Sequence, residues 1–333
     1  MELVDYDTLV FMHPSYVCNF SCVYCGQHCG DPRSVKTLDI GRIMQGLDRF
    51  GRTLLVSICG GEPFLIPNLI EFVQEVKRKH YVRIDSNLSL TDRCRTFLDA
   101  VGPERITEII FSVHALEREK RGLDLMDLIV LVKEFQAKGF RMAGDYVTYP
   151  PLFSRLEKDI DLFRAHGIKV MPVLFCGEYQ GRNYPFHQGS VSYSKEELDL
   201  VFRYNSLAKI VLHNPHGEYC QAGCTAFCLN DRYEVFPCLS MLIRNTNKIG
   251  DLFSGWRTAP KVIKCPMHYC ADQYNKTFMC TLSQFNLAYM QLKAMRDRGV
   301  LSERESAVFL RGGWRKYLMR KTAAFLRKRS SQR

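Results

Sequence analysis

The sequence predicts an α/β fold with a parallel sheet, followed by a smaller cysteine-rich region. Through about the first 200 residues, short apolar runs alternate with segments of helical periodicity, and turn-forming residues separate them. Strands that alternate with helices in this way usually lie parallel, because each helix crosses back over the sheet. The predicted strands are 8–13, 53–59, 81–85, 107–113, 140–148 and 168–175.

The segments between these strands carry apolar residues at helical spacing, so each predicts a helix that covers the sheet. The predicted helices are 37–50, 66–79, 91–100, 123–138 and 153–166. Thr37, Thr91 and Ser154 are the expected N-caps, and Gly139 and Gly167 are expected to end the last two helices. After the sixth strand, a turn-rich segment predicts a linker, and a Ser-Lys-Glu-Glu run predicts a capped helix. The linker is 177–185 and the capped helix begins at Ser194.

Composition limits the class of protein. The 333 residues suffice for one large domain and a smaller one, and 46% hydrophobic with 24% charged residues is typical of globular proteins. Fourteen cysteines without a secretory leader argue against a disulfide scaffold and indicate metal-bound thiols in a reducing cytoplasm. No apolar stretch approaches the length of a membrane span. We therefore expect a cytoplasmic metalloprotein.

Three cysteines follow the first predicted strand, at a point where parallel α/β barrels place their chemistry. Cys18, Cys22 and Cys25 have the spacing C-x3-C-x2-C. A four-iron cluster normally takes one thiolate per iron, so three thiolates suit a cluster with one iron open to another ligand. Zinc usually takes two close pairs or a Cys/His mixture. A structural zinc loop and scattered buried thiols are the alternatives.

A second motif, Cys-Gly-Gly-Glu-Pro, follows the second predicted strand and includes Gly60, Gly61 and Glu62. Adjacent glycines let the backbone approach a ligand closely, and a carboxylate accepts hydrogen bonds from an ammonium group. Together the two motifs resemble the radical S-adenosylmethionine (SAM) superfamily. There, the open iron of a [4Fe–4S] cluster binds SAM, and the Gly-Gly-Glu-Pro motif contacts the methionine amino group. The residue before the third cysteine is typically aromatic in that family, and here it is Tyr24.

The resemblance implies a partial (β/α)6 TIM-like barrel, with SAM lying across the strand ends. Polar residues at those ends are then candidates for SAM binding, although Ser and Asn also favour turns that bind no ligand. The candidates are Ser86 and Asn87 after the third strand, and Ser112 and His114 after the fourth. Asp145, on the fifth strand, is expected from its position alone to face the substrate.

Half of the cysteines crowd into a segment of about sixty residues after the barrel. They are Cys220, Cys224, Cys228, Cys238, Cys265, Cys270 and Cys280. Their order, with a predicted hairpin formed by 219–224 and 231–238, resembles the auxiliary-cluster region of SPASM and twitch radical SAM enzymes. The C-x2-C-x5-C-x3-C run of a full SPASM domain is absent, whereas the shorter twitch version needs about four thiolates for one cluster.

The ligands implied for this second [4Fe–4S] cluster are Cys220, Cys238, Cys265 and Cys270, with Cys224 as the replacement for Cys220. A structural zinc site is the alternative, because four cysteines can also close a tetrahedron.

The remaining thiols divide into two groups. Some radical SAM epimerases use a cysteine to return a hydrogen atom to the opposite face of a substrate radical, and three cysteines near the second cluster are candidates for that role. These are Cys224, Cys228 and Cys280. The others are expected to be ordinary buried thiols. They are Cys29, Cys59, Cys94 and Cys176.

The C-terminal segment is strongly basic. Of the formal net charge of +11, residues 311–333 carry +9 and the rest of the chain carries +2. Trp314, Leu318 and Phe325 recur at helical spacing and predict a basic amphipathic helix. Such a helix suits an anionic membrane surface, an acidic peptide or nucleic acid, and the alternative is a terminal helix with solvated charges. The sequence has no recognisable nucleic-acid-binding module.

The expected organisation is a barrel at 1–208, a twitch-like domain at 209–285 and a helical basic tail at 286–333. The resemblance implies an oxidoreductase or epimerase that reductively cleaves SAM and takes a hydrogen atom from a polar small-molecule or sugar-like substrate. An electron donor such as flavodoxin or ferredoxin would supply the electron.

Two other functions fit the sequence less fully. A maturase that epimerises or cross-links a ribosomal peptide is the first alternative, but such enzymes often carry an N-terminal leader-binding domain, and here the barrel begins almost at residue 1. The second is a non-enzymatic metal-binding protein that docks to a membrane or nucleic acid through its tail. That alternative leaves the Gly-Gly-Glu-Pro motif unexplained.

Overall fold

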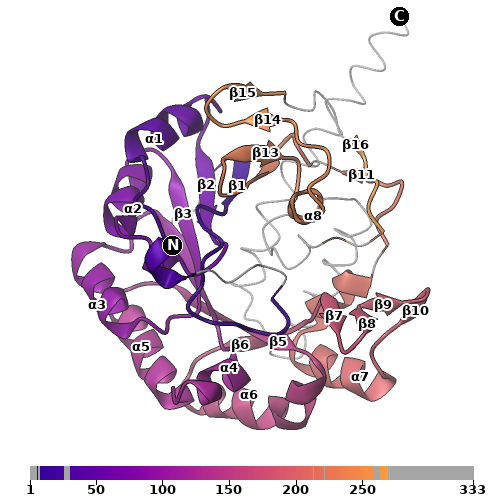
Figure 1. The fold of residues 1–333 in the computed structure, drawn as a ribbon. Helices are drawn as coiled ribbons and strands as arrows, with labels where there is room; N and C mark the ends of the chain where they lie inside the picture. The colour runs from indigo at the N-terminus through magenta and orange to yellow at the C-terminus, as the bar shows by residue number, and fades with distance from the viewer. Residues whose placement is uncertain are drawn as a thin grey trace, which may run out of the picture.

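A curled sheet with helices on its outer face forms the main body of the protein (Figure 1). The structure, a computed structural model, describes residues 6, 8–25, 31–212, 214–220, 222–257, 263–268 and 270. Six parallel strands lie side by side in chain order, as the sequence predicts. They are β1 (Thr8–Met12), β2 (Leu54–Ile58), β3 (Tyr81–Ser86), β4 (Ile106–Ser112), β5 (Met142–Thr148) and β6 (Val170–Leu174). This is the arrangement of a partial TIM-like barrel.

All five predicted helices are present and line the convex side of the sheet (Figure 1). They are α1 (Ile40–Asp48), α2 (Leu69–Lys77), α3 (Thr91–Ala100), α5 (Leu125–Ala137) and α6 (Leu156–Ala165). The α3 helix has the predicted bounds, and the other four are shorter by one to three residues at each end. A short helix that the periodicity did not predict, α4 (Ala115–Lys120), follows β4 directly. Four 3₁₀ segments complete this part of the chain. They are η1 (Pro32–Ser34), η2 (Pro63–Leu65), η3 (Pro150–Arg155) and η4 (Ser206–Leu212).

The strands separate two apolar environments, because successive side chains point to opposite faces of a sheet. On β1, Val10 and Met12 belong to the large core beneath the helices. Leu9 and Phe11, on the other face, pack with Leu55 and with residues of the C-terminal region. The second face is the concave, inner side of the barrel.

The predicted helix ends are partly wrong. Asp39 caps α1 in place of Thr37, since its carboxylate accepts the N–H of Arg42 at 3.1 Å. Thr91 is the first residue of α3 and not its cap. The α6 helix begins after Arg155 and not at Ser154, because paired prolines start the preceding 3₁₀ turn.

The glycine stops are confirmed. Gly139 and Gly167 follow α5 and α6 with φ of 88° and 70°, a left-handed conformation that favours glycine.

The segment predicted as a linker forms a hairpin instead, and a second hairpin follows it. Strands β7 (Gly177–Tyr179) and β8 (Arg182–Tyr184) pair with each other, and β9 (Phe186–His187) pairs with β10 (Ser190–Val191). Turn formers and tyrosines coexist here, and Tyr184 and Tyr193 are buried in the main core, which fixes the hairpins. The predicted capped helix is confirmed as α7 (Lys195–Tyr204), with a complete capping box between Ser194 and Glu197.

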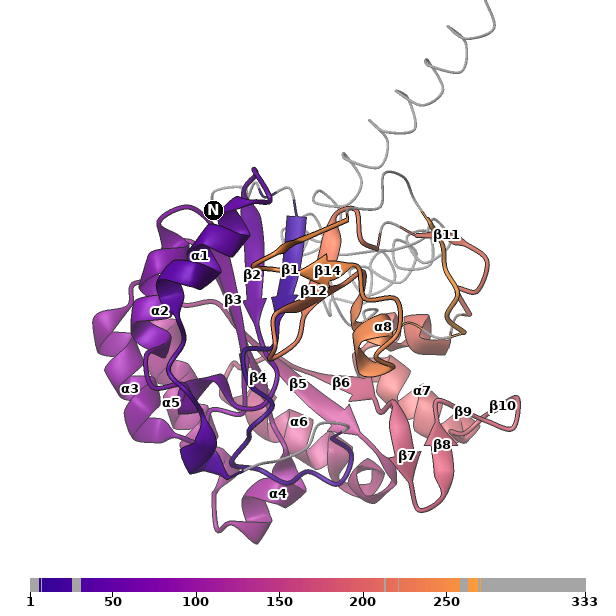
Figure 2. The same cartoon turned by 45° about the horizontal axis from the view of Figure 1, so that its top comes forward.

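The cysteine-rich region continues the barrel sheet (Figure 2). Strand β12 (Ala226–Leu229) pairs in parallel with β1, and three antiparallel strands follow outward. They are β13 (Glu234–Phe236), β14 (Gly250–Asp251) and β15 (Gly255–Trp256). A hairpin is present as β12 and β13, with its first strand at 226–229 in place of the predicted 219–224, and α8 (Leu239–Ile243) follows it.

A separate pair, β11 (Tyr219–Cys220) with β16 (Ile263–Lys264), lies in the same part of the chain. Because β12 joins the sheet of the first domain, the division at 208/209 stays a prediction. The predicted tail at 286–333 lies outside the described residues. Within the described ranges, no helix is long and apolar enough to cross a membrane.

Candidate functional site

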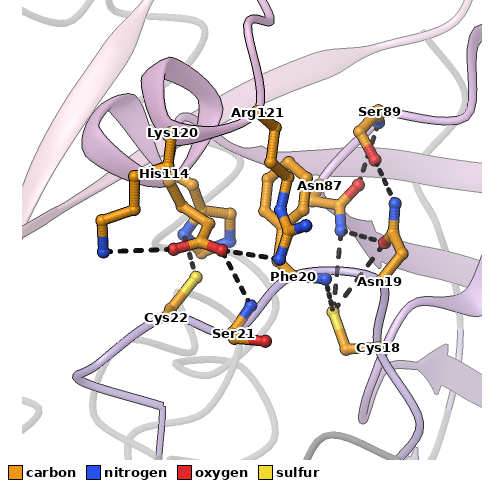
Figure 3. A network of polar contacts seen from close by, with 11 residues as sticks. Cys18, Asn19, Phe20, Ser21, Cys22, Asn87, Ser89, His114, Lys120 and Arg121 are labelled. Carbon is orange, nitrogen blue, oxygen red and sulfur yellow. Dashed lines mark hydrogen bonds and ion pairs between the residues drawn. The ribbon is translucent and has the colours of Figure 1, made fainter. Parts of the chain in front are cut away.

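The loop that carries the first three cysteines, residues 13–25 and here called the cysteine loop, leaves β1 at the carboxyl ends of the parallel strands. Cys18 and Cys22 are partly exposed and Cys25 is exposed. The N–H of Cys25 donates to the carbonyl of Cys22 at 2.9 Å, so these two residues share a tight turn. The Sγ of Cys18 accepts from the Phe20 N–H at 3.4 Å and from Asn87 Nδ2 at 3.7 Å (Figure 3). Two N–H donors at one sulfur suit a metal-bound thiolate.

The two glycines of the second motif bring it against the cysteine loop. The N–H of Gly61 donates to the Ser15 carbonyl and that of Glu62 to the Val17 carbonyl, both at 2.9 Å. A Cβ on Gly60 would lie 2.4 Å from the Ser15 carbonyl oxygen, and one on Gly61 would lie 1.9 Å from that of Val17. Gly60 also has a φ of 114°. Gly60 and Gly61, which the sequence predicts to lie close to a ligand, therefore also let their own backbone pack against the backbone of the cysteine loop.

Glu62 joins the ends of β2 and β3. Its side chain is buried, with Oε1 accepting from the Phe64 N–H at 3.0 Å and the Ser86 hydroxyl at 2.7 Å. Its Oε2 accepts from the Asn87 N–H at 2.8 Å. Burial raises the pKa of Glu62, while these hydrogen bonds and the Arg118 charge oppose the rise. The structure thus brings three of the predicted site residues, Glu62, Ser86 and Asn87, into one hydrogen-bonded group.

Asn87 extends this group to the cysteine loop. Its Nδ2 donates to Asn19 Oδ1 at 3.0 Å as well as to Cys18, and Asn19 Nδ2 donates to the Ser89 hydroxyl at 2.7 Å (Figure 3). The Ser89 N–H closes the set by donating to Asn87 Oδ1 at 2.9 Å. The end of β3 therefore holds the loop from one side.

His114 holds the loop from another side. It follows β4 in a left-handed conformation with a φ of 46°, and its Nδ1 lies 3.6 Å from the Sγ of Cys22. The same nitrogen hydrogen-bonds to the hydroxyl of Tyr24, and the Tyr24 ring lies 4.8 Å from that of Tyr149. Burial lowers the pKa of His114 to about 3, so the ring is neutral near pH 7. Within the described residues, Ser112 shares no hydrogen bond with this group, and it lies in register with Asp145.

Burial raises the pKa of Cys22 to about 12, although the hydrogen bond from Tyr24 opposes the rise. A metal that binds this sulfur must therefore displace a proton.

Sequence reasoning missed α4, whose charged side chains contact the loop. Glu117 accepts the N–H of Ser21 at 3.0 Å and pairs with Arg121 at 2.8 Å. Arg118 is buried, and it donates from Nε to the Val113 carbonyl at 2.9 Å and from Nη2 to the Asn87 carbonyl. A run of charges after a strand usually marks a solvated helix face, so no pattern distinguished these residues.

The inner face of the barrel carries a charged group below this end of the strands. Arg83 is 4% exposed, donates from Nε to the Ser57 hydroxyl at 2.9 Å and pairs with Asp85 at 3.2 Å. Burial raises the pKa of Asp85 to about 6, with Arg83 opposing the rise and the negative charge of Asp145 adding to it. The guanidinium lies 5.3 Å from the centre of the Phe11 ring, which places this group on the concave face.

The four predicted ligands of the second cluster, here called the second cysteine cluster, pack together: three are buried with Ala222, Met241 and Met267, and Cys265 is partly buried against them. They are Cys220, Cys238, Cys265 and Cys270. Backbone hydrogen bonds of 2.7 and 2.8 Å join Cys265 to Glu218 and Gly217, beside the β11–β16 pair. Burial raises the pKa of Cys265 to about 11, and the neighbouring thiols add to the rise.

The donor sets at both places suit iron–sulfur clusters. Among the described residues, no three Cys, His, Asp or Glu side chains converge on a single ion position. Thiolates of a four-iron cluster bind different irons, so their sulfurs need not converge on one point. The assignment of these cysteines as ligands stays a prediction.

The other cysteines are dispersed. Cys224 is partly exposed, and Cys228 is fully buried on β12 between Phe11 and Phe236. Cys94 is buried as predicted, but Cys59 and Cys176 are only partly buried because each lies just beyond a strand end. The predicted donor Cys280, together with Cys29 and the basic segment 311–333, lies outside the described residues.

Sequence comparison finds similar proteins among curated sequences. This chain is 29% identical over 200 residues to a "Probable GTP 3',8-cyclase" of Metallosphaera sedula, covering 55% of this chain and 60% of that protein. It is 31% identical over 125 residues to a protein of the same name from Saccharolobus islandicus, covering 35% of this chain and 39% of that protein. The chain therefore matches less than two thirds of the length of these relatives.

Solved structures share the fold. Streptococcus suis SuiB bound to precursor peptide SuiA superposes with a TM-score of 0.53 at 18% identity, covering 77% of this chain and 65% of that chain. Native anSMEcpe with bound AdoMet gives 0.54 at 17% identity, covering 74% of this chain and 79% of that chain. The family model described as "Radical SAM superfamily" matches residues 12–179 of this chain. These residues contain five of the six parallel strands, all three loop cysteines and the Gly-Gly-Glu-Pro motif. As this match spans half of the chain, the protein belongs to the radical SAM superfamily.

Proposed function

We propose that this enzyme reductively cleaves SAM at a [4Fe–4S] cluster held by Cys18, Cys22 and Cys25, and takes a hydrogen atom from an unactivated carbon of a polar small molecule. The supporting observation is the hydrogen-bonded joining of the cysteine loop to Gly61, Glu62 and Asn87 at the carboxyl ends of the strands. Members of the superfamily use a [4Fe–4S] cluster and SAM. When bound, these cofactors supply a 5′-deoxyadenosyl radical, and the protein supplies position and exclusion of water.

The residues around the loop have distinct tasks in this proposal. The Glu62 carboxylate has about four acceptor sites, of which Phe64, Ser86 and Asn87 use three, so one remains for the methionine ammonium group of SAM. Tyr24 and the neutral His114 lie against Cys22, and they exclude water from that side of the loop. Ser112 is proposed to contact the SAM ribose from the end of β4.

The inner face supports a polar substrate. Arg83, Asp85 and Asp145 present both signs of charge on the concave side of the strands, where they can hold hydroxyl or amino groups. The named relatives point the same way, because the name GTP 3',8-cyclase describes an enzyme that acts on a nucleotide. An oxidation or an epimerisation is the proposed outcome, with flavodoxin or ferredoxin as the electron donor.

The second cysteine cluster is proposed to hold an auxiliary [4Fe–4S] cluster that accepts or relays an electron. For epimerisation, Cys224, Cys228 and Cys280 are the proposed hydrogen-atom donors. Of these, Cys224 is partly exposed and Cys228 is fully buried beside Phe11 and Phe236.

Peptide modification is the second candidate function. The observation in its favour is the shared fold of SuiB, which was solved with its precursor peptide, and of anSMEcpe, which was solved with a bound peptide. The two candidates differ in what stimulates turnover. A polar small molecule that increases 5′-deoxyadenosine formation, with no response to peptides, favours the first.

The deciding experiment uses anaerobically reconstituted protein with dithionite and SAM. We would measure 5′-deoxyadenosine and iron per chain for the wild type, for the Cys18/Cys22/Cys25→Ala variant and for a variant with the second cysteine cluster replaced by alanine. Each replacement should lower iron from about eight to about four atoms, and the first should abolish 5′-deoxyadenosine. The matched control is Cys94→Ala, which removes a buried thiol from α3 and should change neither quantity. Zinc in place of iron in the wild type would overturn the proposal.

A further inference from the structure

We propose that Glu117 is a positioning residue for the cysteine loop, and that it fixes the backbone between two cluster ligands and sets the charge beside them. This inference rests on the proposed function of Cys18, Cys22 and Cys25. Neither the sequence motifs nor the similarity to other radical SAM proteins assigns a role to α4.

The first step is the contact itself. Oε1 of Glu117 accepts the backbone N–H of Ser21 at 3.0 Å, across a sequence separation of 96 residues. Ser21 directly precedes Cys22, and its amide lies in the stretch between Cys18 and Cys22. A carboxylate that accepts from a backbone N–H makes a charge-assisted hydrogen bond, which is stronger than a neutral one. This bond therefore limits the movement of the loop at the residue next to a ligand.

The second step is what holds Glu117 in place. Its side chain is 6% exposed, and its carboxylate pairs with Arg121 at 2.8 Å and with Lys120 at 3.6 Å. Arg121 and Lys120 lie at the same end of α4 in Figure 3, on the side that faces the loop. Two ion pairs to neighbouring residues and one hydrogen bond across to the loop therefore restrict the orientation of this buried carboxylate.

The third step is that α4 does not depend on Glu117. Arg118 anchors the helix to the barrel through the carbonyls of Val113 and Asn87. The guanidinium carbons of Arg118 and Arg121 lie 5.8 and 5.3 Å from the centre of the Phe20 ring, which is the neighbour of Ser21. Removal of the Glu117 carboxylate therefore takes one contact away from the loop, while the helix keeps the contacts of Arg118.

The fourth step is electrostatic. The Glu117 carboxylate is hydrogen-bonded to the amide of Ser21, the residue before Cys22, so its negative charge lies close to that proposed ligand. Reduction of a thiolate-bound cluster adds negative charge, which a nearby carboxylate opposes in a partly buried site. Neutralising Glu117 should therefore make the reduction potential of this cluster more positive. The two effects, positional and electrostatic, can be separated because glutamine keeps the acceptor oxygen and loses the charge.

The experiment compares Glu117→Ala and Glu117→Gln with the wild type, all reconstituted anaerobically as full-length chains. Glu119→Gln is the matched control, because Glu119 lies on the same helix but is exposed and pairs with Arg155. The readouts are the rate of iron loss to a chelator, the midpoint potential from an EPR-monitored titration, and hydrogen exchange at the Ser21 amide. Circular dichroism verifies that each variant is folded.

We expect iron loss and Ser21 exchange about tenfold faster in Glu117→Ala, the size of one lost charge-assisted hydrogen bond. Glu117→Gln keeps an acceptor oxygen, so it should accelerate iron loss less than Glu117→Ala does and shift the potential to a more positive value, and Glu119→Gln should change neither. If Glu117→Ala does not fold, the potential of Glu117→Gln decides. The inference is overturned if the wild type loads iron and both Glu117 variants match it in every readout. A wild type that loads no iron would instead sink the proposed function, and the Ser21 exchange would still test the contact.

Discussion

Gly61 lies where the backbones of the cysteine loop and the Gly-Gly-Glu-Pro segment come closest. Any side chain there would have to displace the Val17 carbonyl, which is backbone and cannot rotate away. The hydrogen bond from Glu62 to that same carbonyl would be lost with the displacement. The glycine is therefore required by the protein's own geometry, whether or not SAM is bound.

Gly61→Ala should destabilise the protein by about 3 kcal/mol, the upper range for overpacking, and should lower the iron bound per chain by about four atoms. Thermal unfolding and iron analysis of the reconstituted variant measure both effects. Gly41→Ala is the control, because a Cβ on this α1 residue meets only the Asp39 Oδ1 at 3.9 Å. An equal loss of iron in both variants would show that the close approach at Gly61 is not the cause.

His13 makes stability depend on pH. Burial lowers its pKa to about 4 from its ordinary value of 6.5. Below pH 6.5 the unfolded chain binds a proton that the folded chain does not, so the folded state loses stability as pH falls toward 4. His80, whose pKa burial also lowers, acts in the same direction.

We expect His13 to cost about 2 kcal/mol of folding free energy between pH 7 and pH 5, and His13→Asn should remove that part of the dependence. Urea unfolding of both proteins at the two pH values measures it under matched anaerobic conditions. A pH dependence of equal size in the variant would assign the effect to other groups.

Strand β12 binds the C-terminal region to the barrel through its side chains as well as its backbone. Phe227 is fully buried, with its ring 5.1 Å from Phe50 of the barrel and 6.5 Å from Trp256 on β15. The residue therefore links two elements that the sequence predicts to lie in different domains.

Phe227→Ala should lower the free energy of unfolding by about 3 to 5 kcal/mol, as for other buried aromatic residues. If the two regions form one cooperative unit, circular dichroism and tryptophan fluorescence should give one shared urea midpoint for the wild type and one shared, lower midpoint for Phe227→Ala. Val191→Ala, at an exposed position, should change the free energy by less than about 0.5 kcal/mol. Separate transitions in the wild type would contradict the shared unit.

The elements differ in how well the sequence predicted them, for physical reasons. Strands β1, β2 and β6 were predictable because every residue in them is buried, which gives short hydrophobic runs. The α4 helix has six residues and no apolar period, and Arg118 anchors it to carbonyls just beyond the ends of β3 and β4.

The site residues likewise divide into those that the sequence predicted and those that it did not. The spacing of Cys18, Cys22 and Cys25 marked the loop, and the loop does lie at the strand ends. The order of the later cysteines also led to the four that gather in the second cysteine cluster. Contacts between distant residues, such as Glu117 with Ser21, left no local pattern, since a single charge in a helix has the same appearance whether it is buried or solvated.

At the scale of the whole molecule, one sheet runs from β6 through β1 to β15. This sheet connects the part of the chain that carries the cysteine loop with the part that carries the second cysteine cluster. The cysteine loop leaves the sheet after β1, and Cys228 lies on the strand beside β1. The second cysteine cluster flanks β12 in sequence, with Cys220 before it and Cys238 after the hairpin. The strand pair β1–β12 is thus the physical link between the proposed catalytic and auxiliary centres.

The pairing of β1 with β12, in which Leu9 lies opposite Ala226, forms late during synthesis on the ribosome. A ribosome makes all six parallel strands before β12, so β1 leaves the ribosome with one side of its backbone unpaired. An unpaired strand that carries Leu9 and Phe11 on one face is a template for association with other chains. Slow translation or loss of the C-terminal region should therefore favour aggregates of nascent chains, and a chaperone that covers β1 would raise the yield of folded protein.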